Sequence, residues 1–181
     1  MSESGSGSGR IAALKDLHLQ TVLVENGQAR AAVVAPAGEG YASAARLLLD
    51  RISAMTGVAL PVLSPEDLPP ETIRRFNLIL LGNAPDNALV RRLLWERWLL
   101  DTWYPGDGTF VVRSIHNPFG LGTNVLFLGG ENPASVRAAA AKFLDTLKPG
   151  HPLAAGWTMA FETDRRGQPV SEEAIRAAVE R

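Results

Sequence analysis

Residues 124–147, NVLFLGGENPASVRAAAAKFLDTL, decide the fold because they contain a strand, a turn and a helix with a signal at each boundary. The apolar run 125–128 predicts a strand that is covered on both faces, and two glycines end it. Asn132 is a favoured N-cap and Pro133 suits the first helical position, so the helix is expected to begin there. Apolar side chains then recur at helical spacing and predict one stripe facing a sheet: Val136, Ala139, Ala140, Phe143, Leu144 and Leu147.

The same order of strand, short loop and helix occurs twice more. The predicted strand 29–35 leads through a Pro- and Gly-rich loop into a helix expected over residues 41–55, which Gly57 ends. Residues 78–81 (LILL) predict a buried strand, and a helix is expected from about Asn87. Alternation of this kind predicts parallel strands joined by helical crossovers. We therefore expect an α/β (α+β) fold: a mixed, mostly parallel sheet flanked by helices in a single layered domain.

Hairpin and edge signals predict the other elements. The dipeptide Asn26-Gly27 lies between two β-rich stretches and predicts a β-hairpin with a type I′ turn. Residues 109–115 and 124–128 predict a second hairpin with a long loop. An edge strand, a short helical turn and a last strand are expected at residues 58–63, 71–75 and 157–162.

Composition narrows the class of protein. The chain has 181 residues, of which 46% are hydrophobic and 20% charged, and this fits one globular domain with a sizeable core. A formal net charge of −1, with scattered Lys and Arg, argues against nucleic acid or an anionic membrane surface as partner. The absence of cysteine excludes disulfides and thiolate chemistry. No apolar run approaches the ~20 residues of a membrane span, so a soluble chain is expected, and its cellular location stays open.

The predicted organisation has three parts. Residues 1–10 lack the basic and apolar regions of a signal peptide and are interpreted as a flexible leader or an expression tag. Residues 11–170 are expected to form the single α/β domain. Residues 171–181 predict a terminal helix or the start of a further region.

Motifs for catalysis and metal binding are mostly missing from the sequence. His18, His116 and His151 are far apart and have no ligand spacing, so neither a metal nor a cofactor is expected. Gly120 and Gly122 precede a strand rather than a helix, and we interpret them as turn glycines rather than a phosphate loop. Glycoside hydrolysis needs two carboxylates, and the candidate pairs are Glu162 with Asp164 and Asp101 with Asp107. We interpret both pairs as parts of solvated turns rather than as catalytic groups.

Residues 93–104 (LLWERWLLDTWY) are the most aromatic part of the chain. Leu94, Trp95, Trp98 and Leu99 can share a broad helical face, which predicts a core or interface role for both tryptophans. Asn83 and Asn87, just before this segment, are interpreted as turn and cap residues rather than ligands.

Four residues form a candidate contact set in predicted loops at the two ends of one strand: Trp103, Tyr104, His116 and Asn117. The strand between them can hold the two pairs at opposite ends of the sheet. Flat rings with polar tips suit a sugar, whose C–H face stacks while its hydroxyls need hydrogen-bond partners. The alternative is packing against a neighbouring domain, and we favour this interface over a sugar contact.

Three stretches carry a resemblance to a known domain: ASAARLLLDRISAMTGVALPVL (42–63), ILLGNAPDNALVRRLL (79–94) and VLFLGGENPASVRAAAAKFLDTL (125–147). In this order they resemble the N-terminal α/β domain that precedes the catalytic barrel in β-hexosaminidase-like and α-glucuronidase-like glycoside hydrolases. The shared pattern is a helix that ends in Thr-Gly before an L-P-V strand, followed by two apolar strands that end in glycine. The sequence departs from it where residues 134–141 replace a G-x-x-Y-G segment, and no barrel follows Arg181.

This resemblance implies a non-catalytic accessory domain of a carbohydrate-active enzyme. Its partners would be a catalytic domain in cis or another protein, together with a polysaccharide. No catalytic residue of those enzymes belongs to this domain, so none is assigned, although the parent protein would be a glycoside hydrolase. The alternative is a free-standing small-molecule-binding protein or enzyme on a doubly wound scaffold, with its site at the carboxyl ends of the strands.

Overall fold

The computed structural model describes residues 20–66, 68–99 and 109–162, and a six-stranded sheet lies at its centre. In spatial order the strands are β4 (Val62–Leu63), β3 (Ala31–Val34), β5 (Asn77–Gly82), β7 (Val125–Gly130), β6 (Phe110–Ile115) and β9 (Met159–Glu162). The first four run parallel, whereas β6 is antiparallel to both of its neighbours. The predicted α/β class with a mixed, mostly parallel sheet is confirmed.

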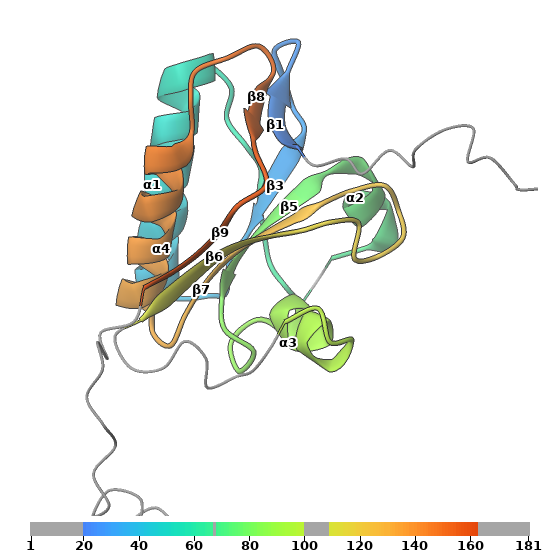
Figure 1. Ribbon diagram of the computed structural model, residues 1–181, viewed down its shortest axis with the longest axis vertical. Coiled ribbons are helices and arrows are strands. Elements are labelled where there is room, and N and C mark those ends of the chain that lie inside the picture. Colours follow the sequence, from blue (N-terminus) through green and yellow to red (C-terminus); the bar gives the residue numbers. More distant parts are fainter. Residues whose placement is uncertain (1–19, 67, 100–108, 163–181) are drawn as a thin grey trace, which may run out of the picture.

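Helices cover both faces of this sheet (Figure 1). Helices α1 (Glu39–Thr56) and α4 (Pro133–Thr146) lie side by side on one face, and α2 (Pro70–Arg75) and α3 (Ala88–Trp95) pack on the other. Along β3 the side chains alternate between the two cores, which explains why the parallel strands read as continuous apolar runs. No helix in the described ranges combines the length and apolar character that a membrane span needs.

The strand, turn and helix of residues 124–147 form as the sequence predicts. All six residues of β7 are buried, and the Asn132 side chain caps α4 by accepting a hydrogen bond from Ser135 N (3.0 Å). Every residue of the predicted stripe is buried. A Cβ on Gly130 would lie 2.6 Å from Ser135 Cβ, so a glycine is needed where the strand meets the helix.

A small second sheet is formed by β2 (Gln28–Ala29), β1 (Thr21–Glu25) and β8 (Leu153–Ala155). Asn26 and Gly27 have φ values of 51° and 70°, as the predicted type I′ turn requires. The prediction of one continuous strand over residues 29–35 is wrong, because the hairpin strand ends at Ala29 and β3 then joins the large sheet. The four residues of β3 are buried on both faces and therefore suit a sheet interior rather than an exposed hairpin.

The predicted helical face shared by Trp95 and Trp98 is also wrong. Helix α3 ends at Trp95, and Arg97 adopts the left-handed conformation (φ 62°) that glycine usually supplies at this position. Arg97 N donates to Leu94 O and Trp98 N to Leu93 O, which closes the helix end. Trp95 is 80% exposed and Trp98 38% exposed, so neither is a core residue.

The remaining predictions differ from the structure in detail. The second hairpin is confirmed, since Ile115 of β6 pairs with Val125 of β7. The edge strand β4 is confirmed but holds only two residues, and β8 was not predicted. The predicted leader 1–10 and terminal segment 171–181 lie outside the described residues.

Candidate functional site

The carboxyl edge of the parallel strands is the first place to look for a site. Strand β3 is followed by α1 on one face of the sheet, whereas β5 is followed by α3 on the other face. Doubly wound folds bind ligands at this kind of switch point, in a crevice between the two loops. Here the loops are residues 35–38 and 83–87.

A buried tyrosine joins the start of α1 to the second of these loops. Tyr41, in the first turn of α1, is 5% exposed, and its hydroxyl donates a hydrogen bond to Asp86 Oδ2 (2.5 Å). Burial raises the pKa of Tyr41 well above its ordinary value, and the hydrogen bond to Asp86 and the negative charge of Asp86 raise it further. Tyr41 therefore remains a protonated donor at physiological pH.

Glycines lie close to prolines at this edge. A Cβ on Gly82 would lie 3.1 Å from the Pro36 ring, and one on Gly40 would lie 2.5 Å from Pro133 Cβ. The Asn83 side chain donates to Glu131 O (2.9 Å) and so ties the loop after β5 to the loop after β7. These contacts join the segments that follow β3, β5 and β7 at this edge.

Asn87 confirms the predicted cap at this edge and leaves no polar atom of its carboxamide for a ligand. It is fully buried, its Nδ2 donates to Leu81 O (2.9 Å), and its Oδ1 accepts from Leu89 N and Val90 N. The turn role predicted for Asn83 is also confirmed, since its Oδ1 accepts from Asp86 N. Among the described residues, no group of three His, Asp or Glu side chains is arranged to hold a metal ion.

The candidate contact set lies elsewhere, in part at the amino edge. His116 and Asn117 follow β6 at that edge and are half-buried. Strand β6, about 20 Å long, separates them from Thr109, the described residue that is nearest in sequence to Trp103 and Tyr104. Trp103 and Tyr104 lie outside the described residues. The structure thus places two of the four predicted residues, as neighbours in one loop.

Internal hydrogen bonds organise this loop, residues 116–123. Asn117 has a positive φ (40°), its Oδ1 accepts from Gly122 N (2.8 Å), and its carbonyl accepts from Gly120 N (3.1 Å). Gly120 and Gly122 have φ values of 67° and 82°, which confirms their interpretation as turn glycines. The guanidinium of Arg92 on α3 lies 5.0 Å from the Phe119 ring centroid and fixes the outer part of the loop.

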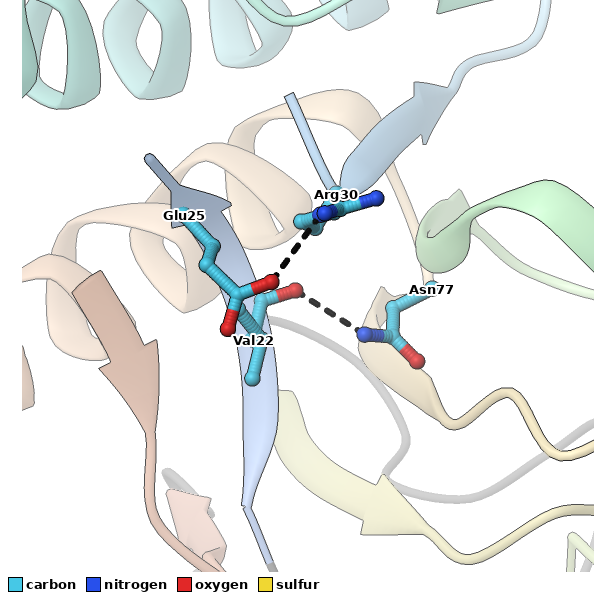
Figure 2. Close-up of polar contacts among 4 residues, drawn as sticks. All are labelled: Val22, Glu25, Arg30 and Asn77. Atoms are coloured by element: carbon cyan, nitrogen blue, oxygen red, sulfur yellow. Dashed lines mark hydrogen bonds and ion pairs between the residues drawn. The ribbon is translucent and has the colours of Figure 1, made fainter. Parts of the chain in front are cut away.

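Two asparagines behind the loop were not recognised from the sequence. Asn77 Nδ2 donates to Val22 O on β1 (2.9 Å), and Asn77 Oδ1 accepts from Asn124 N (2.7 Å). Figure 2 shows the first of these bonds beside the ion pair of Arg30 with Glu25 (3.2 Å), which is exposed. Each asparagine stands directly before an apolar run, and in the sequence that position predicts only a turn.

The candidate carboxylate pairs are described only in part. Asp101, Asp107 and Asp164 lie outside the described residues, and only the backbone of Glu162 is described, at the end of β9.

Comparison with known proteins identifies the fold. Thirty-four chains of solved structures match, and no known protein family and no curated protein sequence does. One matching structure is that of CpGH84D, with a TM-score of 0.51 and 16% sequence identity. The match covers 79% of this chain and 21% of that chain. The fold is similar to part of a family 84 glycoside hydrolase.

At 16% identity this likeness concerns the fold alone. In fold, it confirms the predicted resemblance to a glycoside hydrolase domain. The chain spans about one fifth of the length of CpGH84D.

Proposed function

We propose that this chain is a non-catalytic accessory domain of a carbohydrate-active enzyme, in which it supports a catalytic domain. We further propose that residues 11–170 are the domain, residues 1–10 a leader or tag, and residues 171–181 a terminal helix or the start of a further region. Two findings support the proposal: the similarity in fold to one fifth of CpGH84D and the close packing at the carboxyl edge.

The close packing at the carboxyl edge is the observation that carries the proposal. A catalytic or ligand-binding protein on a doubly wound scaffold uses this edge for its site. In this chain the Tyr41–Asp86 hydrogen bond and the close approach of Gly82 to the Pro36 ring join the segments at that edge to one another. We therefore rank the free-standing enzyme or small-molecule-binding protein second.

The four residues of the candidate contact set are proposed to contact the catalytic domain or, as a second choice, a glycan. His116 and Asn117 support this role because they are half-exposed in a loop whose backbone is held by hydrogen bonds. A preorganised loop loses little conformational entropy when a partner binds. Trp103 and Tyr104 enter the proposal on their chemistry alone.

The test measures catalysis and binding on the full chain. Assays with a panel of chromogenic glycosides should show no turnover. An NMR titration with a panel of polysaccharides should perturb only residues 103, 104, 116 and 117, or none if the loops contact a domain instead. Turnover of any glycoside, or perturbations centred on Tyr41 and Asp86, would contradict the proposal.

The parent gene supplies a second test. An open reading frame that continues into a glycoside hydrolase barrel is the expected result. A parent gene without any carbohydrate-active domain would rule out the accessory role.

A further inference from the structure

We propose that Asn77 and Asn124 form a latch that couples strand β1 to loop 116–123. We call these two residues the asparagine latch. The latch lies at the amino edge of the large sheet, at the starts of the neighbouring strands β5 and β7. It connects two segments that belong to different sheets.

Each carboxamide of the latch bridges two segments in the same way. The NH₂ group of each side chain donates to a carbonyl in the segment that forms β1: Asn77 to Val22 O (2.9 Å) and Asn124 to Gln20 O (3.2 Å). The oxygen of each accepts from a backbone N–H of another segment. Asn77 Oδ1 accepts from Asn124 N (2.7 Å), and Asn124 Oδ1 accepts from Asn117 N (3.1 Å).

These bonds form a continuous relay from β1 to the loop. Gln20 O accepts from Asn124, Asn124 accepts from the Asn117 backbone, and the Asn117 side chain accepts from Gly122 N. Hydrogen bonds in such chains polarise and strengthen one another in a low-dielectric environment. Asn124 is 6% exposed, so its bond to Gln20 O, directly before β1, is shielded from water.

The position of β1 is what makes this relay a coupling device. β1 pairs with β2 and β8 in the small sheet, so the ladder of the six-stranded sheet does not hold it. Besides its own sheet and the bond from Arg30 N to Leu23 O (2.9 Å), the latch and apolar contacts, among them those of fully buried Leu23, attach β1 to the rest of the domain. When β1 leaves its place, the latch loses both carbonyl partners and the loop loses its support.

The functional consequence rests on the proposed role of His116 and Asn117. If these residues contact a catalytic domain or a glycan, docking of β1 sets whether they are presented in the ordered loop. The coupling of β1 to the loop does not depend on that role, and it can be measured without any ligand.

The experiment is native-state hydrogen exchange of the Asn117 and Gly122 amides, measured by NMR on the full chain. Leu23→Ala weakens the seat of β1 without touching the latch, and Leu48→Ala is the matched control on α1, since both leucines are fully buried. Compared at equal global stability, Leu23→Ala should speed exchange of both amides about tenfold more than Leu48→Ala, the effect of losing a buried hydrogen bond. In an Asn124→Ala background the extra effect should vanish.

Equal exchange in the two leucine variants would overturn the latch. If Leu23→Ala does not fold, Asn77→Asp takes its place, because it removes the donor to Val22 O and keeps the acceptor for Asn124 N. The amide signals of Asn117 and Gly122 should then shift, and unchanged signals would overturn the proposal. A polysaccharide titration that leaves the wild-type loop unperturbed bears only on the glycan role, so the two proposals fail separately.

Discussion

The two edges of the six-stranded sheet are held together by different means. At the carboxyl edge, two glycines lie against the rings of Pro36 and Pro133, and Tyr41 donates a hydrogen bond to Asp86. At the amino edge, asparagine side chains connect the large sheet to the segment of β1 and to loop 116–123. The difference teaches that a doubly wound architecture can pack its usual ligand edge tightly while the opposite edge joins two sheets.

The largest effect is expected where the carboxyl edge has no free space. Gly130→Ala places a Cβ 2.6 Å from Ser135 Cβ and 2.9 Å from Val136 N. Overpacking against helix backbone should lower the free energy of unfolding by about 3 kcal/mol, measured by urea denaturation. Gly156→Ala, where a Cβ meets nothing within 4 Å, is the control and should stay within about 0.5 kcal/mol of wild type.

Asn87→Ala should be the next most damaging change at the same edge. It uncaps α3 and removes the donor to Leu81 O, so unfolding free energy should fall by about 2 kcal/mol. Asn132→Ala, at the half-buried cap of α4, should cost about half as much. Equal losses in the two variants would show that burial does not add to the capping energy here.

Gly122→Ala tests the amino edge, where a Cβ has free space and only the backbone conformation would be strained by alanine. A Cβ there meets nothing within 4 Å, but φ is 82°, so alanine should cost about 1 kcal/mol in thermal or urea unfolding. Gly122→Asn should cost less, because asparagine tolerates this conformation better. A loss as large as that of Gly130→Ala would remove the contrast between the two edges.

Tyr41→Phe is expected to have the smallest effect near neutral pH, about 0.5–1 kcal/mol for one hydrogen bond. Its pH dependence is more informative. The folded protein holds the Tyr41 proton with a raised pKa, so this stability is complete below pH 10 and is lost as pH rises further. Above pH 10 the Tm of the wild type should therefore fall more steeply than that of Tyr41→Phe, and parallel curves would contradict the raised pKa.

Local signals predicted the elements whose cause is local. Asn132 and Asn87 cap helices because their side chains bond to amides two or three residues ahead, which spacing alone reveals. The end of α3 was missed because Arg97, not a glycine, takes the left-handed position after the helix. An arginine at that position does not indicate in the sequence that a helix ends.

The features that the sequence did not reveal depend on distant partners. Strand β8 has three residues and forms only by pairing with β1, more than a hundred residues earlier. The roles of Asn77 and Asn124 depend likewise on carbonyls of Val22 and Gln20, which no local pattern connects to them. The candidate contact set was predicted from the chemistry of its side chains. Whether its two pairs lie near each other depends on the positions of loops, which hydrophobic periodicity does not predict.

The pairing of β1 with β8 has a consequence for biosynthesis. Thr21 leaves the ribosome early, whereas its partner Ala155 emerges only after every strand of the large sheet except β9 has been synthesised. Contacts of such long sequence separation form slowly. During synthesis β1 can therefore pair with β2 in the hairpin, but its other edge stays unpaired until β8 has been made.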